Sequence, residues 1–85
     1  MRVLVIINRS LSDAKAAQGL RAAVAYAAAG IAVTVALLDD KTAAPEKTAR
    51  HLATLRALDQ RVISVDEAAL CQLLSAGPWH ATVVW

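Results

Sequence analysis

The polar segment Asn8-Arg9-Ser10 follows an apolar run and offers an amide, a guanidinium and a hydroxyl group for binding. Near the start of a helix, such groups suit a small anion. The segment contains no glycine, which excludes the glycine-rich loops that hold a dinucleotide or a nucleoside triphosphate. The alternative interpretation is that Ser10, Ser12 and Asp13 only cap the following helix, with Ser10 and Asp13 at capping-box spacing.

Cys71 is the only thiol, and the neighbouring residues Leu70, Leu73 and Leu74 place it inside a predicted helix. With Leu70 and Leu74 facing a sheet, Cys71 is expected to be packed and unreactive. The alternative is a catalytic nucleophile or persulfide carrier, with His80 or an arginine at a subunit interface stabilising its thiolate. A lone cysteine also excludes an internal disulfide and a multi-cysteine metal site.

The acidic and histidine residues give no metal motif. Asp39 and Asp40 follow an apolar run, but neighbouring side chains at a strand end point apart, so a solvated turn is predicted there. Asp66 follows a different apolar run and is a further candidate ligand-binding residue. His51 and His80 are too far apart in sequence for a metal-binding motif. We expect neither a metal nor another cofactor.

The composition limits the remaining classes of protein. The chain has 85 residues, of which 58% are hydrophobic, 19% charged and 4% aromatic, with a net charge of +2. These values favour one packed domain over residues 1–85 and argue against a disordered chain or a nucleic-acid surface. No apolar run reaches the roughly 18 residues that span a bilayer, and no secretory leader follows Met1. We therefore expect a cytoplasmic protein without membrane or nucleic-acid partners.

The pattern of apolar residues predicts alternating strands and helices. Runs rich in β-branched residues predict strands at 2–8, 31–38, 61–65 and 81–85. Helices are predicted between them at about 13–29, 45–58 and 66–76. The alternation indicates an α/β fold with a single four-stranded, mainly parallel sheet and three helices. We expect the flavodoxin-like strand order 2-1-3-4.

This strand order makes two further predictions. Ligands of open α/β sheets bind beyond the carboxyl ends of the strands where the strand order reverses, which would bring Asn8, Arg9 and Ser10 close to Asp66. Right-handed connections would place the first helix on one face of the sheet and the other two helices on the opposite face. The first face would then be uncovered beside strands three and four, so a homo-oligomer is predicted. The first helix is apolar almost all round, which independently favours burial on all sides by a second copy. The alternative is that its outward-facing alanines reflect helix propensity only.

Several segments together resemble a known family. The segments are 3–7, 18–23, 30–35, 39–40, 62–67 and 83–85, each a part of a strand-helix-strand unit. In these segments the chain resembles the DsrE/DsrF/DsrH-like proteins of sulfur relay. The resemblance implies a DsrE-like α/β fold, homo- or hetero-oligomers and other sulfur-transfer proteins as partners. The family carries persulfide on loop cysteines, and the matching positions here hold Asn8–Asp13 and Asp66, so Cys71 does not inherit that role by position.

Two functions follow as hypotheses. The first is a sulfur-relay component that transfers persulfide on Cys71, or an accessory subunit for partners that do so. The second is a non-catalytic interaction or small-ligand-binding subunit with no chemistry of its own. A small-anion site at Asn8-Arg9-Ser10 is the form of ligand binding that the residues suggest.

Overall fold

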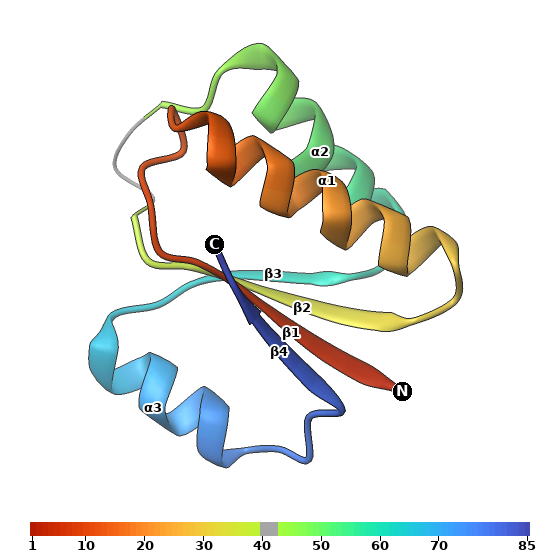
Figure 1. Cartoon of the computed structure of the whole chain (residues 1–85), viewed down its shortest axis with the longest axis vertical. Helices are drawn as coiled ribbons and strands as arrows, with labels where there is room; N and C mark the ends of the chain where they lie inside the picture. Colours follow the sequence, from red (N-terminus) through yellow and green to blue (C-terminus); the bar gives the residue numbers. More distant parts are fainter. Residues whose placement is uncertain (40–42) are drawn as a thin grey trace.

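The computed structural model describes residues 1–39 and 43–85. Within this part of the chain, four parallel strands form one sheet with three helices packed on it (Figure 1). The elements are β1 (Arg2–Ile7), α1 (Ala14–Ala28), β2 (Ala32–Leu37), α2 (Glu46–Ala57), β3 (Arg61–Ser64), α3 (Glu67–Ser75) and β4 (Ala81–Val84). The predicted α/β class is confirmed, and every predicted element is present with its ends within one residue. No helix in the described ranges is long and apolar enough to cross a membrane.

The strand order is β3-β2-β1-β4, so the predicted order 2-1-3-4 is wrong. β1 pairs with β2 on one side and with β4 on the other, with Val5 opposite both Val35 and Val83. β3 extends the sheet beyond β2, with Val62 opposite Val35. Both orders use the same alternation of apolar strands and helices. The pattern of residue types therefore did not distinguish between β1 and β2 as the neighbour of β3.

The observed order changes which helices share a face. The connections β1-α1-β2 and β2-α2-β3 cross in the same direction, so α1 and α2 lie together on one face. α3 crosses back over the sheet to reach β4 and lies on the opposite face (Figure 1). The prediction that the second and third helices share a face is therefore wrong.

Each face of the sheet has its own apolar cluster. On one face, Val5 of β1 packs with Leu20 of α1 and Leu55 of α2. On the other face, Leu4 of β1 packs with Leu73 of α3. Successive side chains of a strand point to opposite faces, and β1 lies between two strands, so its residues are buried on both sides.

A close approach between α1 and the end of the chain fixes the position of the helix. A Cβ atom built on Gly19 would lie 2.6 Å from Cγ of Trp85 and 2.8 Å from Cδ1 of Ile7. Only glycine leaves room for the Trp85 ring on this side of the helix. The buried side of α1 comprises Ala16, Gly19, Leu20 and Ala23.

The surface of the sheet that was expected to be uncovered, on the face of the first helix, differs from the surface that the structure leaves exposed. On the face of the first helix, α2 packs close to β3, which the predicted strand order had left bare. Among the large hydrophobic side chains of the sheet, the most exposed is Val84 of β4, at 61% exposure. Val84 pairs with Ile6, whose side chain belongs to the cluster beneath α3, so it faces the α3 side. The argument that placed an uncovered surface on the first face is therefore wrong.

Candidate functional site

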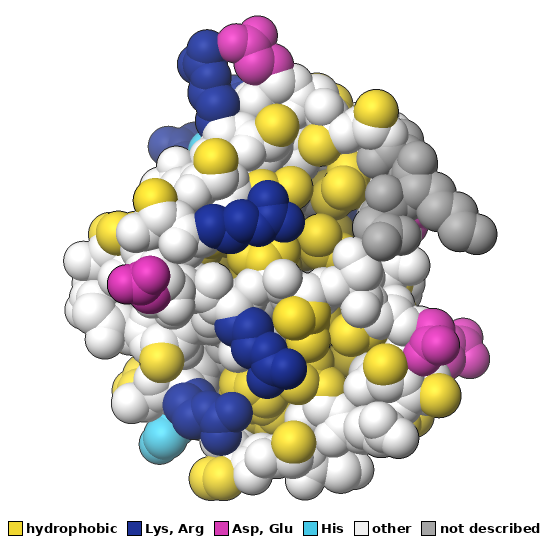
Figure 2. All heavy atoms as spheres, turned by 180° about the vertical axis from the view of Figure 1, so that it is seen from behind, with side chains coloured by type: hydrophobic (Ala, Val, Ile, Leu, Met, Phe, Trp, Pro, Cys, Tyr) yellow, Lys and Arg dark blue, Asp and Glu magenta, His cyan; other side chains and the backbone are white. Residues whose placement is uncertain are grey.

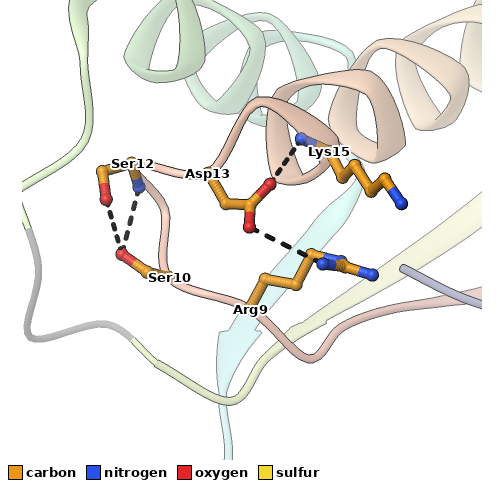
Figure 3. Close-up of polar contacts among 5 residues, drawn as sticks. All are labelled: Arg9, Ser10, Ser12, Asp13 and Lys15. Atoms are coloured by element: carbon orange, nitrogen blue, oxygen red, sulfur yellow. Dashed lines mark hydrogen bonds and ion pairs between the residues drawn. The ribbon is translucent and has the colours of Figure 1, made fainter.

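The loop between β1 and α1 holds a small network of polar contacts (Figure 3). Asp13 is the N-cap of α1, and its Oδ1 accepts a hydrogen bond of 2.8 Å from the backbone N–H of Lys15. The other oxygen, Oδ2, lies 3.6 Å from Nη1 of Arg9. The hydroxyl groups of Ser10 and Ser12 lie 2.8 Å apart. The predicted capping box is therefore absent, because Asp13 itself caps the helix while Ser10 contacts Ser12.

The three loop residues predicted to bind a ligand differ in exposure. Asn8 is exposed, and its backbone N–H donates a hydrogen bond of 2.8 Å to the carbonyl oxygen of Trp85. Arg9 and Ser10 are half-buried. Nε of Arg9 and Nε1 of Trp85 are buried without a hydrogen-bond partner in the described structure. Arg9 in the loop and Trp85 after β4 therefore each hold a buried donor without an acceptor.

A cleft of about 400 Å³ opens beside this loop, between the first turns of α1 and α2. We call it the basic cleft. Its wall on the α1 side includes Ala17, Gln18 and Arg21, which recur at helical spacing and so share one side of the helix. Its wall on the α2 side includes Lys47 and His51, four residues apart. Ser12, Asp13, Ala14, Pro45 and Thr48 complete the lining.

The basic cleft carries more positive than negative charge. Arg21 and Lys47 are exposed, and neither takes part in an ion pair within residues 1–39 and 43–85. His51 is half-buried beside them. Among the described residues of the lining the one acid is Asp13, which is already engaged by Arg9 and by the first turn of α1. The free positive charge makes the cleft attractive to an anion.

Sequence patterns missed the basic cleft. At helical spacing, Lys47, Arg50 and His51 of the second helix look like one exposed polar side without a partner element. The structure separates them: Arg50 pairs with Glu46 at 2.6 Å, while Lys47 and His51 face α1. The sequence does carry a signal for the cleft, because polar residues recur at helical spacing on both helices. This spacing indicates a shared site only once α1 and α2 are known to lie on the same face of the sheet.

Asp66 does not join the loop after β1. It is the N-cap of α3, and its Oδ1 accepts a hydrogen bond of 2.7 Å from the N–H of Ala69. β2 lies between β3, which precedes Asp66, and β1, and α3 begins on the other face of the sheet. The structure therefore leaves Asp66 apart from this loop, in which Arg9 contacts Asp13 and Ser10 contacts Ser12. Asp39 is half-buried and engaged in contacts, and its neighbour Asp40 lies outside the described residues.

Cys71 is exposed on α3, so the expectation of a packed thiol is wrong. The helix is rotated from its predicted orientation. Leu73 is buried and Leu70 packs on the same cluster, whereas Leu74 is 44% exposed. Residues three apart share a side of a helix, so Cys71 and Leu74 point outward together. The hydroxyl of Ser75 donates to the carbonyl oxygen of Cys71 at 3.0 Å.

His80 is engaged at the start of β4. Its Nδ1 accepts a hydrogen bond of 3.0 Å from the backbone N–H of Arg2, whose guanidinium lies 4.4 Å from the centre of the Trp79 ring. Trp79 in turn donates from Nε1 to the carbonyl oxygen of Leu73 at 3.0 Å. These contacts hold both residues within the fold. Among the described residues, no three His, Cys, Asp or Glu side chains form a group that could hold a metal ion.

Comparisons with protein-family models, with curated proteins and with solved structures found no match to this chain. The resemblance to the DsrE/DsrF/DsrH-like family therefore remains a prediction. The candidate site rests on its own geometry.

Proposed function

We propose that this chain is a small-ligand-binding subunit that takes a small anion in the basic cleft. The observation that carries the proposal is the set of three basic side chains around one concave space. Arg21, Lys47 and His51 converge there from two helices, and the one carboxylate among the described lining residues, that of Asp13, is already compensated. A phosphate or carboxylate group would gain charge-assisted hydrogen bonds from these donors.

The lining also limits the size and shape of the ligand. A volume of about 400 Å³ lies near the lower end of the range for small-molecule sites. Ala14, Ala17 and Pro45 supply apolar surface beside the basic groups. This combination suits an anionic head on a small apolar body, such as a phosphate monoester.

Thermal unfolding at constant ionic strength tests the proposal. Inorganic phosphate and the phosphate monoester phenyl phosphate should raise the melting temperature by several degrees at saturation, because they bind the folded state. Arg21→Gln and Lys47→Gln should each weaken binding about 10-fold, the effect of losing one charge-assisted hydrogen bond. Arg56→Gln is the matched control, because Arg56 is exposed on α2 but outside the cleft.

Two results would contradict anion binding in the cleft. One is an unchanged melting temperature with phosphate, the phosphate monoester and sulfate. The other is an equal loss of binding in Arg56→Gln and Arg21→Gln, which would indicate attraction to the overall charge of the chain.

A second candidate function is sulfur relay, and the exposure of Cys71 favours it. The thiolate of Cys71 would attack the outer sulfur of a donor persulfide. The donor S–S bond breaks, a new S–S bond forms at Cys71, and the donor leaves as a thiolate with no net oxidation. An exposed free thiol also supports a reducing compartment, so we place the protein in the cytoplasm.

Intact-mass measurement tests this second candidate. After incubation with a cysteine desulfurase and free cysteine, the chain should gain the mass of one sulfur atom, and Cys71→Ser should gain none. A wild-type chain that gains no sulfur, while a known carrier in the same mixture does, would leave anion binding as the only candidate function.

A further inference from the structure

β3 is an edge strand, and its backbone is open on one side. In the order β3-β2-β1-β4 its only neighbour is β2. The N–H of Val65 donates to the carbonyl oxygen of Leu37 in β2 at 2.9 Å, so the backbone of Val65 faces β2. Backbone groups alternate between the two sides of a strand. Val62 and Ser64 therefore present their N–H and C=O groups to the open edge.

The side chains along this edge form a surface that is part apolar and part polar. Arg61, Ile63 and Val65 point to the α3 side, where a hollow of about 450 Å³ separates the edge of β3 from α3. Ala69 and Leu73 of α3 form part of the opposite wall of this hollow. Figure 2 looks onto the β3 edge of the molecule, with α2 in the upper part of the view. Hydrophobic side chains gather in two areas on either side of a pale central band, with Lys and Arg side chains beside them.

The edge of β3 has only part of the usual protection against pairing. Natural edge strands are kept from pairing by short length, charged side chains, proline or a bulge. β3 is short and begins with Arg61, but it contains no proline, lysine or bulge and pairs with β2 without an interruption in register. An open edge of this kind can pair with a strand whose charges complement Arg61.

The charges at the two ends of β3 are complementary. Arg61 stands at the start of the strand, while Asp66 and Glu67 follow its end at the first turn of α3. Within the described structure, neither Arg61 nor Glu67 forms an ion pair. In an antiparallel pair, the start of one strand lies beside the end of the other. Two copies would therefore place each Arg61 near the acidic end of the opposite β3.

We propose that this chain forms a homodimer through the edge of β3, with two β3 strands antiparallel and Ile63 opposite Ile63 on the two-fold axis. In this register Val62 of each copy exchanges backbone hydrogen bonds with Ser64 of the other. The two Ile63 side chains pack directly against each other, and Arg61 covers Val65 of the second copy. The same surface serves both copies, as a two-fold interface requires.

The other edge of the sheet fits a second copy less well. β4 (Ala81–Val84) carries no charged residue, so an antiparallel pair of β4 strands brings no opposite charges together. The side chain of Val84 is apolar and exposed, but it lacks the charge pattern that fixes a register. β4 therefore provides a matched comparison, an open edge of the same length without complementary charges.

Sedimentation velocity over a range of protein concentrations tests the proposal. The wild-type chain should sediment as a dimer at high concentration and dissociate on dilution. Ser64→Pro removes an N–H that faces the open edge and should abolish the dimer without removing a bond to β2. Thr82→Pro is the matched control, because the N–H of Trp85 bonds to β1 and Thr82 therefore faces the outer edge of β4.

A charge reversal provides a second and independent variant. Arg61→Glu should weaken dimerisation at least 10-fold, and adding Glu67→Arg in the same chain should restore it by reversing both partners. Circular dichroism of each variant checks that the monomer is folded. Three outcomes would overturn the proposal: a wild-type chain that is monomeric at every concentration, a dimer lost in Thr82→Pro but kept in Ser64→Pro, or a dimer unaffected by Arg61→Glu.

Discussion

Replacement of Leu20 by alanine is expected to lower the free energy of unfolding by about 2–5 kcal/mol, the usual cost of emptying a well-packed core site. Leu20 is 0% exposed and is among the largest fully buried side chains of the protein. It lies in the cluster between α1 and the sheet, where Val5 and Leu55 border the space that it fills. Chemical denaturation followed by circular dichroism measures the change.

Leu58→Ala is the control for this substitution. The side chain of Leu58 is 41% exposed at the end of α2, so the same truncation should change the free energy of unfolding by about 0.5 kcal/mol or less. Equal losses in Leu20→Ala and Leu58→Ala would show that α1 is not packed on the sheet as described.

Gly19→Ala is expected to destabilise the protein, although alanine is the better helix former. Helix propensity favours the alanine by about 1 kcal/mol. The added Cβ, however, would lie 2.6 Å from Cγ of Trp85 and 2.8 Å from Cδ1 of Ile7. Such overpacking costs about 1–3 kcal/mol, so we expect a net loss of stability in chemical denaturation.

A double-mutant cycle identifies the cause of that loss. In a Trp85→Ala background most of the crowding is absent, and Gly19→Ala should then be neutral or stabilising because only helix propensity remains. If Gly19→Ala lowers the stability equally in both backgrounds, the contact between Trp85 and α1 is not what requires glycine.

The secondary structure could be predicted because each element carries its own local signal. The run before Asn8 is β-branched and apolar, Gly30 ends the first helix with a φ of +84°, and Gly77-Pro78 ends the third. These signals act over a few residues, so they do not depend on how the elements are arranged. The ends of the elements were correct for that reason.

The arrangement of the strands could not be predicted from such signals. The choice between β1 and β2 as the neighbour of β3 depends on contacts between distant residues, such as Val35 with Val62. The error in order then moved α2 to the wrong face. The rotation of α3 was missed for a related reason, because Leu70, Leu73 and Leu74 are equally apolar and only the structure shows that Leu74 faces outward.

The basic cleft was not predicted from the sequence. The loop residues Arg9 and Ser10 could be identified because a polar loop after a buried strand stands out in the sequence, but neither lines the cleft. Arg21 and Lys47 carried no such signal, because each looks like an ordinary exposed residue of a polar helix side. Their role depends on the packing of α1 beside α2, a property of the whole fold.

The two tryptophans of the chain lie on opposite sides of the sheet. Trp85 packs with the α1 and α2 layer, and Trp79 with the α3 layer. Each indole therefore senses a different half of the molecule, and fluorescence emission from single-tryptophan variants follows the loosening of each half separately. This placement allows the cooperativity of the two layers to be measured without any added label.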